Sequence, residues 1–178
     1  KEPIPVRPAQ HYHMGGIKTD LWAMTNIDGL YACGEVACTG IHGANRLASN
    51  SVLECLVFGR RAALHINNEN RKFKDKTLPD ISCFENDKKI LLPRSSAREL
   101  KNNIRSVMSA HVGAVRTQSG LLAARESLAE ILNKLEQYQL TEPFDFELFS
   151  MAEVSLLIVE AALARKESIG AHYLADSQ

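Results

Sequence analysis

The segment His42-Gly-Ala-Asn-Arg46-Leu-Ala-Ser-Asn-Ser51-Val-Leu-Glu-Cys-Leu56 is the most informative part of this 178-residue chain. It places an arginine, two asparagines and two serines directly before an apolar run with helical periodicity. The first turn of a helix leaves backbone N–H groups unpaired and carries the positive end of the helix dipole. With Arg46 beside it, this helix start predicts a binding site for an anionic ligand.

The composition is that of an ordinary globular chain and gives no electrostatic reason to expect a nucleic-acid partner. Hydrophobic residues make up 45%, and 21 Lys plus Arg balance 21 Asp plus Glu. No apolar run reaches the roughly 18 residues that a membrane span needs, so we expect no membrane partner. The cysteines have no metal-ligand spacing, so we expect no metal site and a reducing compartment, the cytoplasm. They are Cys33, Cys38, Cys55 and Cys83.

The first part of the chain is predicted to form short strands followed by one helix. Glycine-bounded segments predict strands at 15–19 and 29–34. An apolar period then predicts a helix that begins at about Ser49 and ends in the polar run 67–70. Residues 67–95 show no sustained period and are predicted to be a linker.

The second part is predicted to contain three amphipathic helices with short connections. The capping box Ser96-Ala-Arg-Glu99 predicts the start of the first. The second covers about 121–135, and the third runs from about Phe146 to Lys166 after a loop at 139–145. Each helix has an apolar face to bury, and short connections between helices favour packing them as an antiparallel bundle. The predicted core consists of Leu100, Ile104, Val107, Met108, Leu121, Leu122, Leu128, Ile131, Leu132, Leu135, Val154, Leu157, Ile158 and Ala161.

Three motifs resemble, in order, the L-aspartate oxidase branch of the succinate dehydrogenase/fumarate reductase flavoprotein superfamily. They are Pro8-Ala-Gln-His-Tyr-His-Met-Gly-Gly-Ile17, Asp28-Gly-Leu-Tyr-Ala-Cys-Gly-Glu35 and Thr39-Gly-Ile-His-Gly-Ala-Asn-Arg-Leu-Ala-Ser-Asn-Ser51. The dehydrogenase branch usually has Gly-Gly at the position of Ala48-Ser49 and Asp at that of Glu54. On these points the chain is similar to the oxidases.

The resemblance implies an α+β, mostly α fold. Residues 1–75 would be the C-terminal part of an FAD-binding domain, 76–95 a linker and 96–178 a helical bundle domain. Such a protein opens with a Gly-x-Gly-x-x-Gly loop, which the 178 residues do not contain. We therefore expect a C-terminal fragment that is inactive by itself.

The activity implied by the resemblance is FAD-dependent oxidation of L-aspartate to iminoaspartate, with oxygen or fumarate as electron acceptor. Such an enzyme supplies NAD biosynthesis through quinolinate, and a functional link to quinolinate synthase is expected. Two alternatives stay open: a fumarate reductase or succinate dehydrogenase flavoprotein, and a non-catalytic helical interaction module formed by residues 95–178.

The resemblance assigns Arg46 and His11 to the substrate. A guanidinium holds a carboxylate through a planar two-bond fork, and an imidazole can donate a hydrogen bond to a second carboxylate. The residues alone also allow an arginine that satisfies loop carbonyls and a histidine with a backbone partner. No residue of this chain is expected to be catalytic, because the superfamily's proton-transfer arginine belongs to its capping domain.

Three residues are assigned to FAD. Glu35 would accept hydrogen bonds from a ribityl or ribose hydroxyl at the end of a strand. Ser51 and Val52 would act through backbone N–H groups at the helix start, aimed at the flavin. A surface glutamate and simple helix capping are the alternatives. In the tail, His172 is expected to be a structural or surface histidine.

Overall fold

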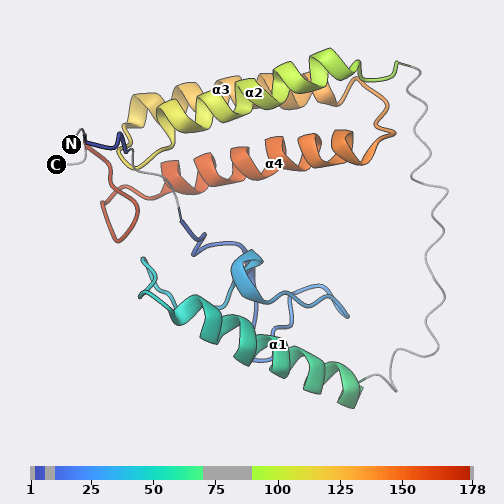
Figure 1. Ribbon diagram of the computed structural model, residues 1–178, viewed down its shortest axis with the longest axis vertical. Helices are drawn as coiled ribbons and strands as arrows, with labels where there is room; N and C mark the ends of the chain where they lie inside the picture. Colours follow the sequence, from blue (N-terminus) through green and yellow to red (C-terminus); the bar gives the residue numbers. More distant parts are fainter. Residues whose placement is uncertain (1–2, 7–10, 70–89, 177–178) are drawn as a thin grey trace. The chain divides into compact units, whose positions relative to one another are not determined.

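The computed structural model describes residues 3–6, 11–69 and 90–176. The chain forms two compact units, which are described separately (Figure 1). One comprises Gln10–Asp80, and the other comprises Lys1–Ala9 with Ile81–Gln178. The predicted linker, 76–95, lies largely outside the described residues, so the domain boundaries stay a prediction.

The Gln10–Asp80 unit contains a small parallel sheet. Strand β1 (Ile17–Lys18) pairs with β2 (Ala37–Cys38), and Ile17 lies opposite Ala37. The strand predicted at 15–19 is confirmed only over its two central residues. Gly16 allows the close approach, because a Cβ on it would lie 2.3 Å from the carbonyl oxygen of Val36.

The strand predicted at 29–34 is wrong. Within this segment only Tyr31 makes a bridge, antiparallel to Met24. Gly29 and Gly34 have φ angles of 85° and 77°, which turn the backbone out of the extended conformation at both ends of the segment. Gly34 instead begins η1 (Gly34–Val36), a turn of 3₁₀ helix that leads into β2.

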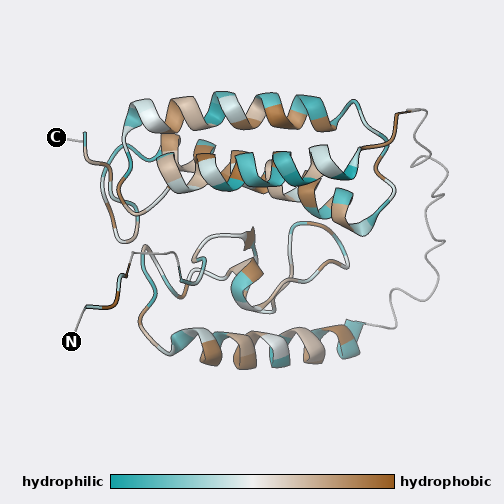
Figure 2. Cartoon of the chain, turned by 45° about the horizontal axis from the view of Figure 1, so that its top comes forward, coloured by the Kyte–Doolittle hydropathy of each residue, from teal (hydrophilic) through white to brown (hydrophobic). Residues whose placement is uncertain are grey.

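Helix α1 (Asn50–Glu69) begins and ends where the apolar period predicts. Its buried face consists of Glu54, Phe58 and Ala62, which recur every four residues, and Phe58 and Ala62 pack on Ala23. Hydrophobic and hydrophilic residues alternate along α1 (Figure 2), and several of its apolar side chains are exposed. Within the described parts of the chain, no helix combines the length and apolar character that crossing a membrane requires.

The other unit is a bundle of α2 (Arg94–His111), α3 (Gln118–Leu135) and α4 (Pro143–Ala164), which lie side by side in Figure 1. Its buried core is apolar and draws on all three helices. The core members are Leu92, Ala97, Ile104, Val112, Leu121, Ala124, Leu128, Ile131, Leu135, Leu148, Ala152, Val159, Ala162 and Leu174. The mostly helical fold class with a C-terminal helical bundle is therefore confirmed.

Two helix starts differ from the prediction. Helix α2 begins at Arg94 after Pro93, which provides no side-chain cap, so the capping box predicted at Ser96–Glu99 is wrong. The capping box lies instead at the start of α4, between Glu142 and Asp145. Helix α4 thus begins at Pro143, inside the predicted loop, because proline is well tolerated in the first turn of a helix.

The buried face of α4 also differs from the prediction. Val154 and Leu157 are 53% and 63% exposed, Ala161 is exposed, and Leu122 of α3 is 41% exposed. The buried residues of α4 are Leu148, Ala152, Ser155, Val159 and Ala162, together with Asp145 in its first turn. Because α4 carries apolar residues on nearly every side, its periodicity does not determine which face is buried.

Candidate functional site

Arg46 lies in the loop that leads into α1, and its guanidinium carbon is 5.2 Å from the centre of the Tyr12 ring. This distance is within the range of a cation–π contact. The side chain is half-buried, and its Nε has no hydrogen-bond partner. No carboxylate of the described residues pairs with it. The arrangement orients a guanidinium without neutralising its charge.

Glu54, which points inward from α1, is 1% exposed and accepts three hydrogen bonds. Its donors are the hydroxyls of Tyr12 and Thr39, both at 2.5 Å, and Nε2 of His42 at 2.8 Å. Burial alone raises the pKa of a carboxyl group, but these bonds outweigh it and hold the pKa of Glu54 below its usual value. The carboxylate is therefore ionised at neutral pH.

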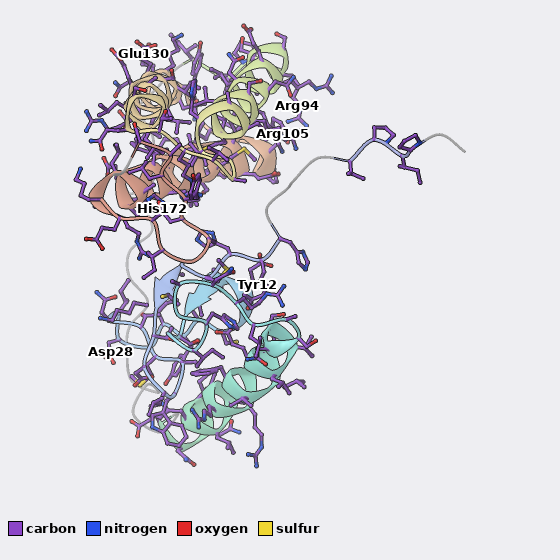
Figure 3. All side chains as sticks on the ribbon, turned by 90° about the vertical axis from the view of Figure 1, so that its left-hand side faces the viewer. Tyr12, Asp28, Arg94, Arg105, Glu130 and His172 are labelled. Carbon is purple, nitrogen blue, oxygen red and sulfur yellow. The ribbon has the colours of Figure 1, made fainter. Side chains whose placement is uncertain are left out.

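Tyr12 lies at the centre of this cluster, beside the start of α1 (Figure 3). The edge of the His42 ring meets it with 5.3 Å between ring centres and 85° between ring planes. Its backbone has a φ of 70°, a left-handed conformation that stores strain in a residue with a side chain. Burial, and then the hydrogen bond to Glu54, raise the pKa of the Tyr12 phenol, which therefore stays a donor.

Of the two residues assigned to the substrate, Arg46 contacts the Tyr12 ring, and His11 neighbours Tyr12 in the sequence. His11 is exposed and directly precedes Tyr12. The Arg46 guanidinium lies over the Tyr12 ring. His42 is buried, and its Nδ1 has no hydrogen-bond partner among the described residues. His11 and Arg46, 35 positions apart in sequence, therefore belong to one region of the Gln10–Asp80 unit.

The residues assigned to FAD lie at η1 and at the start of α1. Glu35 is exposed, and its Oε1 accepts the backbone N–H of His13 at 2.9 Å. Its expected place at a strand end is wrong, because Glu35 lies in the 3₁₀ turn that precedes β2. Ser51 is half-buried and Val52 is 63% exposed in the first turn of α1, where backbone N–H groups lack intrahelical partners.

The hydrogen-bonded cluster of Glu54, Tyr12 and Thr39 is not predicted by the sequence motifs. One signal was available: Glu54 stands four residues before Phe58 and eight before Ala62, so the three share one helix face. A carboxylate on the buried face of an otherwise apolar helical run requires partners. Which donors would reach it could not be read from their sequence positions.

Of the two positions expected for His172, structural or surface, the structure shows the structural one. It is 8% exposed in the tail of the bundle (Figure 3), and its Nδ1 accepts a hydrogen bond from Nη1 of Arg116 at 3.0 Å. Burial, and then the positive charge of Arg116, lower the pKa of His172. The same tail is held to the bundle by backbone bonds between Arg116 and both Tyr173 and Ala175.

Two family models match different parts of the chain. Residues 1–52 match an FAD binding domain, and residues 101–178 match the fumarate reductase flavoprotein C-terminal domain. The first match contains the Arg46 loop and the beginning of α1, and the second covers most of the bundle.

Curated relatives match along 99% of the chain. The L-aspartate oxidase of Rhodospirillum rubrum is 42% identical, that of Yersinia pestis is 41% identical and the chloroplastic L-aspartate oxidase of Arabidopsis thaliana is 36% identical. The chain spans 59%, 33% and 30% of the lengths of these relatives, in the same order.

Solved structures share the fold. A chain of E. coli quinol fumarate reductase superposes with a TM-score of 0.81 at 31% identity, over 98% of this chain and 33% of that one. A chain of the Mycobacterium smegmatis Sdh1 complex gives 0.77 at 29% identity, over 93% of this chain and 30% of that one. The chain belongs to the succinate dehydrogenase/fumarate reductase flavoprotein family, in which it is homologous to the C-terminal part of L-aspartate oxidases.

Proposed function

We propose that the chain is part of an FAD-dependent L-aspartate oxidase, which converts L-aspartate to iminoaspartate with oxygen or fumarate as electron acceptor. The observation that carries the proposal is Arg46, an oriented guanidinium with no carboxylate partner in the described chain. Its loop lies within the part that matches an FAD binding domain. Identities of 36–42% to L-aspartate oxidases support the substrate.

Arg46 would bind one carboxylate of the substrate through the planar fork of its guanidinium. His11, exposed beside Tyr12, would donate a hydrogen bond to the second carboxylate. Two fixed carboxylates leave the Cα–H bond of an amino dicarboxylate little freedom to turn, which is how positioning contributes to catalysis.

The described residues fit FAD at the start of α1. Backbone N–H groups of Ser51 and Val52 belong to a first turn with no intrahelical acceptors, and the exposed Val52 leaves the turn accessible. Glu35, also exposed, would accept hydrogen bonds from a cofactor hydroxyl. FAD, when bound, accepts the two electrons of the breaking Cα–H bond, and oxygen or fumarate then removes them. We propose that the 178 residues alone are inactive, since they contain no glycine-rich phosphate loop.

The proposed partners are small molecules, L-aspartate and fumarate. The proposed product, iminoaspartate, would feed quinolinate and NAD synthesis, which makes a functional link to quinolinate synthase part of the proposal. We also propose the cytoplasm as the location, since Cys33, Cys38 and Cys55 are free thiols.

A fumarate reductase or succinate dehydrogenase flavoprotein is the second candidate. The 29–31% identity to solved chains of that kind favours it. Ala48-Ser49 and Glu54 favour the oxidase, because the dehydrogenase branch usually has Gly-Gly and Asp there. The alternative of a separate helical interaction module has no support of this kind, since the bundle matches the flavoprotein C-terminal domain.

Anaerobic titration of the purified full-length flavoprotein separates the two candidates. We expect L-aspartate to bleach the flavin absorbance, and succinate at the same concentration to leave it unchanged. Bleaching by succinate and not by aspartate would assign the protein to the dehydrogenase branch.

A further inference from the structure

Glu54 has no stated role in the proposed chemistry, yet it is among the most buried side chains of the described residues. It is 1% exposed, whereas its neighbours Leu53 and Cys55 are exposed. Removing a carboxylate from water costs several kcal/mol unless hydrogen bonds or opposite charge compensate it. A leucine at this position of α1 would avoid that cost, so the carboxylate calls for an explanation in terms of its partners.

The partners of Glu54 restrain Tyr12 from several sides. Its carboxylate accepts the Tyr12 hydroxyl at 2.5 Å and also holds His42, whose ring edge meets the Tyr12 ring. A guanidinium, that of Arg46, lies 5.2 Å from the ring centre. The Tyr12 side chain has only two torsion angles, so these contacts fix the position of its ring. The ring in turn determines where the Arg46 guanidinium can lie. The left-handed backbone of Tyr12 agrees with a residue that its surroundings hold in place.

The same bonds keep Glu54 from pairing with Arg46. A carboxylate has about four lone-pair positions, and three are taken by Tyr12, Thr39 and His42. The two hydroxyl donors are neutral, so the negative charge is stabilised mainly by hydrogen bonds rather than by the guanidinium. Arg46 therefore keeps its positive charge for a ligand, while Glu54 acts on it only through the Tyr12 ring.

We propose that Glu54 is a positioning residue for dicarboxylate binding, which holds Tyr12 beneath Arg46 and leaves the guanidinium available to the ligand. This inference rests on the proposed function, because it requires Arg46 to bind a carboxylate. It assigns no contact between Glu54 and the ligand. Removing the Tyr12 hydroxyl or the Glu54 charge should therefore weaken the same interaction.

A double-mutant cycle with Glu54→Gln and Tyr12→Phe tests the inference in the full-length protein. The readout is the Kd of fumarate, measured by calorimetry on the oxidised protein. Reducing fumarate requires a reduced flavin, so the oxidised protein binds fumarate without converting it, whether it is an aspartate oxidase or a fumarate reductase. Each variant should weaken binding about tenfold, the equivalent of one hydrogen bond to a charged group. The double variant should bind about as weakly as the weaker single variant, because both changes break one connection.

Tyr31→Phe is the matched control. Like Tyr12, Tyr31 hydrogen-bonds a side chain of α1 through its hydroxyl, here Nδ1 of His65 at 2.8 Å, but the described cation–π contact of Arg46 is with Tyr12 and not with Tyr31. Loss of the Tyr31 hydroxyl should leave the Kd of fumarate within about twofold of wild type, a difference below about 0.4 kcal/mol. Flavin content, measured on every variant, should not change.

Three results would overturn the inference: unchanged Kd in Glu54→Gln and Tyr12→Phe, weakening that adds fully in the double variant, or equal weakening in Tyr31→Phe. If Glu54→Gln does not fold, the comparison of Tyr12→Phe with Tyr31→Phe decides alone, and equal Kd values would overturn it. The Kd readout is independent of the oxidised substrate. A coupled loss of fumarate binding without aspartate oxidation would therefore support the inference and refute only the proposed function.

Discussion

The helical bundle and the Gln10–Asp80 unit differ in the size of the apolar core that accompanies their buried polar side chains. The bundle buries an apolar core drawn from all its helices, with Ile104, Leu128 and Leu148 almost completely enclosed. The bundle also buries Asp145, Ser155 and His172, but these lie beside a large apolar core. The other unit buries the small apolar cluster of Ala23, Phe58 and Ala62, and beside it the charged Glu54 with His42. The first core serves stability, whereas the second contains groups whose burial is unfavourable unless their hydrogen bonds are satisfied.

This difference separates the part that carries the fold from the part that carries the proposed site. Apolar burial contributes about 25 cal/mol per Å² and tolerates many sequences of similar volume. A buried hydrogen-bonded cluster specifies one arrangement and fails when a single partner is lost. Among the described residues, Tyr12, Ala23 and Ser49 have positive φ angles of 70°, 63° and 71°, and all three belong to the Gln10–Asp80 unit.

The largest effect on stability is expected in the bundle. Leu148→Ala should lower the free energy of unfolding by about 2–5 kcal/mol, because Leu148 is fully buried in α4. Leu157→Ala, the same change on the same helix, should cost less than about 1 kcal/mol, because that side chain is 63% exposed. Hydrogen exchange of α3 peptides in the full-length protein measures both. A larger loss in Leu157→Ala would mean that α4 is rotated from the observed position.

A smaller, pH-dependent effect is expected from His172. Its pKa is lowered below the ordinary value of 6.5, so the unfolded chain binds a proton more readily than the folded one. The stabilisation is present above pH 6.5 and is lost as the pH falls through the lowered pKa. His172→Gln should remove this slope in the protection of α3, after correction for intrinsic exchange rates. An unchanged slope would mean that another group causes it.

Much of the fold could be predicted because long amphipathic helices carry their own signal. The predicted bounds of helix α1 and of the bundle helix α3 lie within a few residues of the observed ones. The buried face of α4 could not be predicted, because a helix that is apolar on nearly every side has no distinct apolar stripe. The strand predicted at 29–34 is wrong for a different reason. Gly29 and Gly34 adopt left-handed backbone conformations, which an extended strand does not allow.

The candidate site was predictable only in part. Arg46 and the start of α1 are local features, so a short segment was enough to identify them. The Glu54–Tyr12 bond joins residues 42 positions apart, and which tyrosine or threonine reaches a buried carboxylate depends on the folded backbone. The hydrophobic periodicity of a single segment cannot predict such a long-range hydrogen bond.

The most direct test of the account is the effect of Arg46→Leu on L-aspartate turnover by the full-length protein, with Arg60→Leu as control. Arg60 lies exposed on α1, so its loss should change kcat/KM less than about twofold. Removing the Arg46 guanidinium should cost about 3–5 kcal/mol of interaction with the substrate carboxylate, or more than about a hundredfold in kcat/KM. Flavin content should stay equal to wild type. A near-wild-type rate in Arg46→Leu would contradict the account and make Arg46 a structural residue of the loop.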